Sequence, residues 1–162
     1  MTAPGPLRAV AEVLVLEMGG EPGFIEEENR PLFHAALELA ANQLAAVIAQ
    51  SAELLEQACE SQPGPPEADS PPGAPPPGRI LGPLVAAAVD NAVRLGDAAL
   101  TGPVVRGDAQ SVATDMAALA AASPGALRAY LALARLTADR ALAAGLLRPA
   151  DAMRLTDVLG DK

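Results

Sequence analysis

The segment Arg30–Cys59 constrains the fold of this 162-residue chain more than any other stretch. It contains no glycine, and its only proline, Pro31, falls in the first turn, where a helix does not use the missing N–H. Most of its residues favour helices, and its apolar residues recur at the spacing of one helix face. Those residues are Leu37, Leu44, Val47, Ile48, Leu54 and Leu55. The segment predicts one long central helix.

This predicted helix carries an unusual polar stripe. His34, Glu38 and Asn42 stand four residues apart, so a helix places them above one another on one face. Asn is a mediocre helix former, and a buried Asn needs a hydrogen-bond partner. Either the stripe is solvated or it lines a site, and the residues themselves leave both interpretations open.

Composition favours an all-α fold. The chain is 51% apolar but only 2% aromatic, which suits Ala-rich helices in close packing better than a β-sandwich. The net charge is −9 and no basic run occurs, so we expect neither nucleic acid nor an anionic membrane surface as a partner. Cys59 is the sole cysteine, which excludes an intramolecular disulfide and a cysteine-based zinc site.

Neither a signal peptide nor a membrane span is expected. The first residues lack a basic region followed by a long apolar core. No window reaches about eighteen uncharged apolar residues. With the single cysteine, these features favour a cytoplasmic location.

Residues 1–29 suggest the closing piece of another domain. Leu7–Met18 has helical periodicity and is followed by Gly19 and Gly20, which are typical of a helix end. Phe24–Ile25 predicts a short strand. A lone strand cannot satisfy its own edges, so we expect residues 1–29 to be a helix–strand remnant of an α/β, Rossmann-like domain.

A Pro-rich stretch interrupts the helical region at residues 61–78. It has no aliphatic residue larger than Ala and is expected to be a solvated, disordered insertion. A ligand role for an aromatic groove is the other interpretation, although no basic residues flank the stretch.

Further helices are predicted at 79–95, at 109–121, after Ser123, and near the C-terminus after Pro149. Leu7–Met18 and residues 79–95 are each expected to present an apolar face, and that of 79–95 is expected to be buried. Asp108 and Ser123 are predicted N-caps, and Pro124 occupies a first helical position. Residues 30–162 are therefore expected to form an all-helical domain of five to six helices around the long one.

No familiar catalytic motif accompanies these helices. The sequence lacks a G-x-G-x-x-G, a P-loop, an H-E-x-x-H and a G-x-S-x-G, and no metal site is expected. Two candidates remain, the polar stripe and the loop Thr101–Asp108. Arg106 stands in that loop between two turns and ahead of a helix N-terminus, where an anion or a carbonyl oxygen would be held.

Three ordered motifs resemble one protein family. They are F-H-A-A-x-x-x-A-x-N at Phe33–Asn42, D-N-A-x-x-L-G at Asp90–Gly96 and L-T-G-P-V-x-R-G-D at Leu100–Asp108. The stretch from about Leu7 to Leu147 is similar to Rossmann-like proteins that carry the domain of unknown function 2520. That group resembles 6-phosphogluconate dehydrogenase, ketopantoate reductase and pyrroline-5-carboxylate reductase.

The resemblance implies a function. In that wider group, a dinucleotide-binding domain precedes a helical domain that supplies substrate contacts and a dimer interface. The implied catalytic residues are His34, where relatives place a Lys, and Asn42. The implied substrate-binding residues are Thr101, Gly102, Arg106 and Asp108. The implied cofactor is NADP or NAD, the implied substrate a small keto acid, hydroxy acid or imine, and the implied assembly a homodimer.

Since this chain has no Gly-rich phosphate-binding turn, we expect it to bind no cofactor and to be inactive alone. Two other interpretations remain open. The chain could instead be a non-enzymatic, acidic helical module that pairs through its apolar faces. It could also be a regulatory scaffold that works through the Pro-rich segment.

Overall fold

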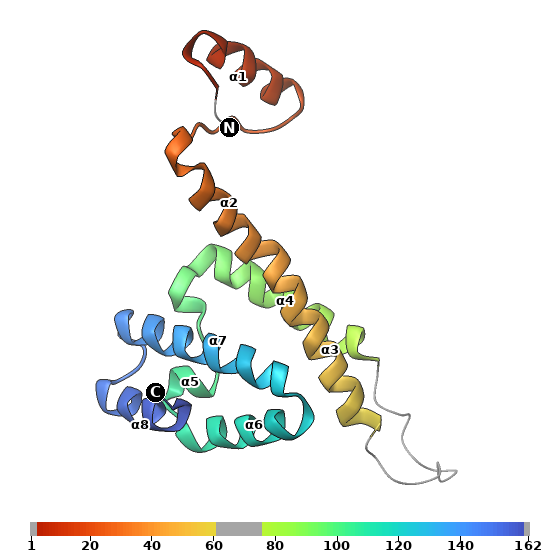
Figure 1. Cartoon of the computed structure of the whole chain (residues 1–162), viewed down its shortest axis with the longest axis vertical. Coiled ribbons are helices and arrows are strands. Elements are labelled where there is room, and N and C mark those ends of the chain that lie inside the picture. Colours follow the sequence, from red (N-terminus) through yellow and green to blue (C-terminus); the bar gives the residue numbers. More distant parts are fainter. Residues whose placement is uncertain (1–2, 61–75, 161–162) are drawn as a thin grey trace. The chain divides into compact units, whose positions relative to one another are not determined.

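The computed structural model describes residues 3–60 and 76–160, and these residues form helices and no strand (Figure 1). The predicted all-α class is confirmed. The chain separates into two compact units, Met1–Ala46 and Val47–Lys162. The boundary between these units falls within the long helix, and the predicted division into residues 1–29 and 30–162 stays a prediction.

The N-terminal unit holds α1 (Arg8–Glu17), α2 (Arg30–Glu38) and the start of α3 (Leu44–Glu60). Short 3₁₀ turns precede the first two helices at Gly5–Leu7 and Glu27–Asn29. A π-helical turn, Leu39–Gln43, joins α2 to α3. The helix is continuous from Glu27 to Cys59, so the predicted long helix is confirmed.

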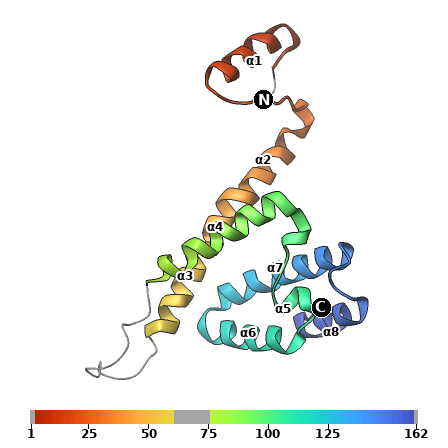
Figure 2. The same ribbon diagram turned by 180° about the vertical axis from the view of Figure 1, so that it is seen from behind.

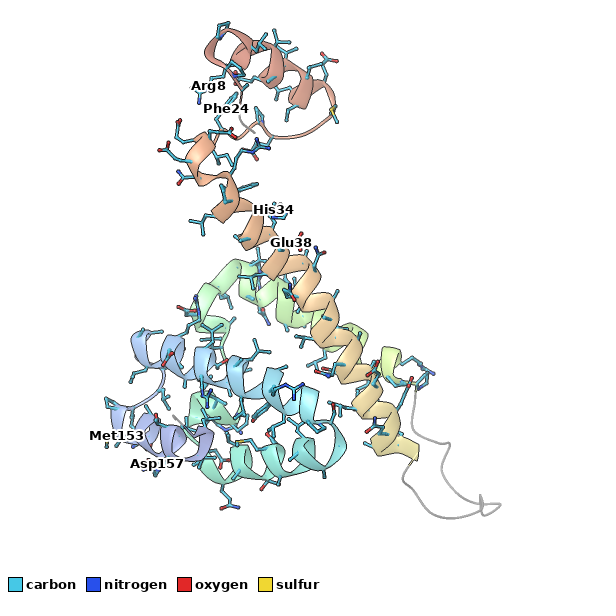
Figure 3. The ribbon with its side chains drawn as sticks, in the orientation of Figure 1. Arg8, Phe24, His34, Glu38, Met153 and Asp157 are labelled. Atoms are coloured by element: carbon cyan, nitrogen blue, oxygen red, sulfur yellow. The ribbon has the colours of Figure 1, made fainter. Side chains whose placement is uncertain are left out.

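The predicted strand at Phe24–Ile25 is wrong. Residues 20–26 form no regular structure, and the described residues offer no partner strand with which Phe24–Ile25 could pair. The Phe24 ring instead lies 4.4 Å from the guanidinium carbon of Arg8, a cation–π contact (Figure 3). The chain folds back on α1, and nothing in this geometry requires a sheet.

The C-terminal unit continues α3 and adds α4 (Pro77–Leu95), a 3₁₀ turn (Gly96–Ala99) and α5 (Pro103–Arg106). It ends with α6 (Ala109–Ala122), α7 (Pro124–Ala143) and α8 (Pro149–Leu159). Both predicted N-caps are confirmed, since Asp108 accepts from the Ser111 N–H and Ser123 from the Ala126 N–H. Helix α4 starts at Pro77, inside the stretch 61–78 that was predicted to be disordered, and residues 61–75 of that stretch lie outside the described residues.

The core lies where α5, α6, α7 and α8 pack together (Figures 1 and 2). Two alanines on α7 let the neighbouring helices approach closely, and Val112 and Leu155 are fully buried. The buried cluster consists of Val104, Val112, Ala134, Ala141, Leu147, Leu155 and Leu159.

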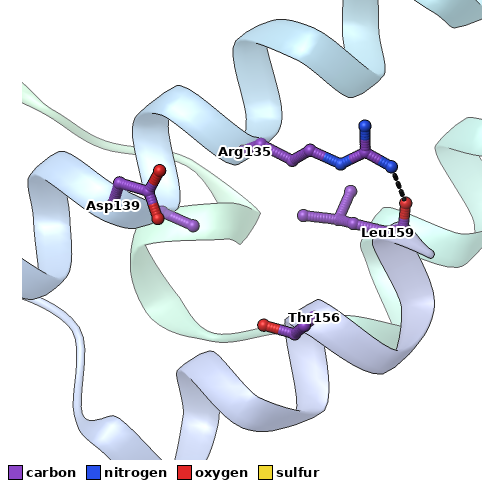
Figure 4. Close-up of a pocket in the computed structure, with 5 residues that line it drawn as sticks. Arg135, Asp139, Thr156 and Leu159 are labelled. Carbon is purple, nitrogen blue, oxygen red and sulfur yellow. Dashed lines mark hydrogen bonds between the residues drawn. The ribbon is translucent and has the colours of Figure 1, made fainter. Parts of the chain in front are cut away.

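An arginine on α7 caps the end of α8. The Arg135 guanidinium donates to the carbonyl oxygen of Leu159 at 2.6 Å (Figure 4). It also donates to the carbonyl oxygen of Gly160 at 2.6 Å. These carbonyls have no partner within the helix, and a cation is favourable at a helix C-terminus. The contact ties the last turn of the chain to the core helix.

The apolar faces predicted for Leu7–Met18 and for residues 79–95 are not buried. Helices α1, α2 and α4 have no buried residue, and Val93 on α4 is 82% exposed. Both segments are helical as predicted, but their apolar residues are not buried within the described part of either unit.

The helix Glu27–Cys59 is the one helix of the described residues that is long and apolar enough, by length and composition, to cross a membrane. Its best window has a mean hydropathy of 1.4 and none of that window is buried. Core helices of soluble proteins pass the same criterion, so the expectation of no membrane partner stays a prediction.

A close approach of backbone to side chain joins α5 to α8. Gly107 follows α5, is buried, and has φ +68, in the left-handed region. A Cβ built on Gly107 would lie 2.5 Å from the Cβ of Asp151 on α8. Only glycine meets both the backbone and the packing requirement here.

We predict that Gly107→Ala destabilises the protein by about 2–4 kcal/mol, because the left-handed backbone and the overlap with Asp151 both oppose a methyl group. Urea unfolding followed by circular dichroism measures this. The matched control is Gly82→Ala on α4, where no atom lies within 4 Å of the new methyl and helix propensity favours Ala. Equal midpoints for the two variants would contradict the prediction.

Candidate functional site

The predicted polar stripe is present on the long helix. The Asn42 side-chain amide donates to Glu38 Oε2 at 2.6 Å, and His34 Nε2 lies 3.8 Å from Glu38 Oε1. Figure 3 shows His34 and Glu38 on the same side of the helix. Glu38 therefore links the two predicted catalytic residues, one through each carboxylate oxygen.

A π turn, Leu39–Gln43, lies within the stripe, directly after Glu38. Asn42 lies inside this turn, and π turns in helices occur frequently at functional sites.

All three side chains of the stripe are accessible. The His34 side chain is 76% exposed and that of Glu38 is 41% exposed. A protonated His34 would be attracted by the Glu38 carboxylate. The arrangement places a proton donor or acceptor and an amide within reach of a bound molecule.

The second predicted group lies on the turn around α5. Thr101 is exposed, Gly102 is the residue before the helix, and Arg106 is its last residue and exposed. The Arg106 N–H donates to the Gly102 carbonyl at 3.2 Å. The Arg106 guanidinium is therefore available to solvent at the end of a short, well-defined helix.

Asp108 has a structural task. Its carboxylate accepts from the Ser111 hydroxyl at 2.7 Å and from the Ser111 N–H at 3.0 Å. These bonds, led by that of the hydroxyl, hold the pKa of Asp108 below its ordinary value. The N-cap role is confirmed, and a role in substrate binding stays a prediction.

The structure places the candidates in two groups. His34 and Asn42 belong to the N-terminal unit, and Thr101, Gly102, Arg106 and Asp108 belong to the C-terminal unit. That the two groups share one cleft stays a prediction.

The cluster of Asp151, Arg148 and Arg154, which packs against the turn at Gly107, was not predicted from the sequence. Asp151 on α8 is 3% exposed, accepts from Arg148 Nε at 2.6 Å, and also pairs with the Arg154 guanidinium. The hydrogen bond from Arg148 is the main reason that the pKa of Asp151 is lowered. This carboxylate packs against Gly107 and so supports the turn that carries Arg106.

Sequence reasoning also missed a groove beside Thr101. It has a volume of about 260 Å³, and the Tyr130 hydroxyl donates to Asp115 across it at 3.3 Å. Burial, reinforced by the Asp115 charge, raises the pKa of Tyr130 to about 12, so its hydroxyl stays protonated at neutral pH. The lining residues are Thr101, Pro103, Val104, Asp115, Tyr130, Leu133, Ala134 and Thr137. Asp115 and Tyr130 are fifteen positions apart in the sequence, so no local sequence pattern indicates this pair.

In the part of the chain that the structure describes, no three His, Cys, Asp or Glu side chains lie close enough together to hold a metal ion.

Comparison with protein families matches residues 1–137 to Domain of unknown function (DUF2520). The chain belongs to the DUF2520 family. The resemblance inferred from the three motifs is thereby confirmed, and all six predicted site residues lie within the matched region. No curated protein and no solved structure matches the chain.

The DUF2520 match ends before α8. Asp151 and its two arginines therefore lie beyond the matched region, although they support a turn inside it.

We predict that Asp151→Asn lowers the free energy of unfolding at pH 7. The difference in this free energy between the variant and the unchanged protein should become smaller in acid. The folded-state pKa of Asp151 lies below its ordinary value of 3.8, so the ionised carboxylate stabilises the fold above about pH 4. That contribution is lost as pH falls through the folded-state pKa. Urea midpoints of both proteins between pH 7 and about pH 3 measure the difference. A constant difference across this range would contradict the prediction.

Proposed function

We propose that this chain is the substrate-binding and dimerising half of an NAD(P)-dependent oxidoreductase that acts on a small keto acid, hydroxy acid or imine. The observation that carries the proposal is the Glu38 carboxylate, which links His34 and Asn42 across a π turn. Membership of the DUF2520 family agrees with the resemblance that first suggested this function.

His34 is proposed to move the proton. Imidazole donates and accepts protons near neutral pH, and a carbonyl or imine that takes up a hydride also needs a proton. Glu38 orients the ring from 3.8 Å. Asn42 is proposed to face the substrate or the nicotinamide, and Thr101, Gly102, Arg106 and Asp108 to contact the substrate.

The cofactor, NADP or NAD, would be held by a dinucleotide-binding domain. This sequence has no Gly-rich phosphate-binding motif, so the chain alone is proposed to bind neither cofactor tightly and to be inactive. The hydride would come from the reduced nicotinamide.

We predict that NADPH oxidation by this chain requires a dinucleotide-binding domain, joined to Met1 or added in trans, and that His34→Ala then lowers turnover about 100-fold. That loss corresponds to the low end of general acid–base catalysis, about 10²–10⁴-fold. The measurement is the loss of NADPH absorbance with a panel of small keto acids and imines.

The control is Glu53→Ala, an exposed carboxylate on α3 outside the stripe. Since the His34 side chain is 76% exposed, its loss should leave the thermal unfolding temperature unchanged. Turnover equal to that of the unchanged protein would remove His34 from the mechanism.

A second candidate function is favoured by the uncovered apolar faces. Large apolar side chains on α1, α2 and α4 are exposed, among them Leu32 and Val93, and the acidic chain would pair with a second copy through them. A non-enzymatic dimerisation module is therefore the alternative. A scaffold acting through residues 61–78 would instead lose partner binding when that segment is deleted.

We predict that light scattering gives twice the 16.3 kDa mass of the chain, because dimerisation covers these faces. The double variant Val89→Asp with Val93→Asp, four residues apart on one face of α4, should shift the mass toward that of one chain. Met153→Asp, at an exposed position of α8, is the control and should leave the dimer intact. A monomer at high micromolar concentration would contradict dimerisation.

A further inference from the structure

The groove beside Thr101 is lined by both apolar and polar side chains. Val104 of α5 and Leu133 of α7 are among the apolar ones, and Asp115 of α6 and Tyr130 of α7 are among the polar ones. At about 260 Å³ it is slightly smaller than the roughly 300–1,000 Å³ of pockets for drug-sized ligands. A molecule that fits it would be small.

The polar side chains of the groove are the Asp115 carboxylate and three hydroxyls, and the hydrogens of two of those hydroxyls are engaged within the protein. The Tyr130 hydroxyl hydrogen is committed to Asp115 at 3.3 Å, and that of Thr137 to the Leu133 carbonyl at 2.8 Å. These three side chains can therefore offer a ligand only hydrogen-bond acceptors, namely the carboxylate oxygens of Asp115 and the hydroxyl lone pairs of Tyr130 and Thr137. The Tyr130 ring adds a π face, which also attracts cations.

No positive charge balances this acceptor set. None of the residues that line the groove is basic. Arg140, one turn beyond Thr137 on α7, is paired with Asp97 at 2.6 Å. A ligand carboxylate would meet Asp115 without a cation beside it, whereas a ligand cation would meet an opposite charge.

We propose that this groove binds the cationic nitrogen of a small amine or iminium compound, with the nitrogen at Asp115 and Tyr130 and the apolar substituent over Val104 and Leu133. The inference rests on the proposed function where it names a substrate class. Among a keto acid, a hydroxy acid and an imine, it selects the nitrogen compound. Uptake of a hydride at the iminium carbon moves the C=N π pair to nitrogen, and the resulting amine takes one proton to remain cationic.

The test is a titration of the whole chain, without cofactor, with three compounds of similar carbon skeleton: isopentylamine, isopentyl alcohol and isocaproate. Amide shifts in NMR spectra report binding and its location. We expect isopentylamine to shift Thr101, Tyr130 and Thr137 saturably, isopentyl alcohol to bind more weakly, and isocaproate not to bind there.

The informative variant is Asp115→Asn, with Asp139→Asn as the matched control. Both remove one exposed carboxylate and change the net charge equally, but Asp139 does not line the groove. At about 0.15 M salt, Asp115→Asn should weaken isopentylamine binding about three- to fivefold, the range of a partly exposed ion pair, and Asp139→Asn should leave it unchanged.

Three results would overturn the proposal. They are equal binding of the alcohol and the amine, binding of isocaproate in the groove, and equal weakening by the two variants, which would mean general attraction to an acidic protein. The titration needs no cofactor, so failure of hydride transfer alone would remove the proposed function and leave the groove. Reduction of a keto acid, with no binding of isopentylamine, would support the proposed function and remove the groove proposal.

Discussion

The contact between Gly107 and Asp151 is the constraint on which the C-terminal unit depends. A carboxylate buried against backbone is costly unless it is paired, and Arg148 and Arg154 provide the pairing. The carboxylate in turn requires a residue without a side chain where α5 ends. Gly107 after α5, Asp151 on α8 and the two arginines paired with Asp151 thus fix the turn that presents Arg106 and begins α6. The same contact joins a region that the family comparison matches to one that it does not.

The rest of the core needs little side-chain volume. Ala134 and Ala141 stand seven residues apart on α7 and are buried with Val112, Leu147 and Leu155. Short side chains bring the helix backbones close, so a few residues suffice to exclude water. This explains how a chain with 2% aromatic residues forms a core at all. The buried cluster of the described residues lies in α5–α8 and the loop before α8.

Helix caps and helical faces could be predicted from the sequence, whereas which residues are buried could not. Asp108 and Ser123 could be predicted as N-caps because a side-chain oxygen just ahead of a helical sequence favours that role. The stripe of His34, Glu38 and Asn42 follows from helical spacing. Periodicity also indicated that Val89 and Val93 share a face of α4, but the spacing of apolar residues does not identify what packs against that face. The short strand failed because Phe24 has an alternative, the cation of Arg8. Asp115–Tyr130 and Gly107–Asp151 depend on tertiary packing, which no spacing in the sequence encodes.

The π turn also resets the phase of the long helix. One residue more is wound into Leu39–Gln43 than an α-helical turn would hold, so every residue after it is rotated by about 100° about the axis. Leu37 and Leu44, seven residues apart, would lie on one line in an unbroken helix and do not do so here. Any surface that packs on this helix must therefore be complementary to two apolar stripes, one before and one after the π turn, that are rotated relative to each other. A single deletion between Leu39 and Gln43 would merge the stripes and misalign the helix with whatever covers it.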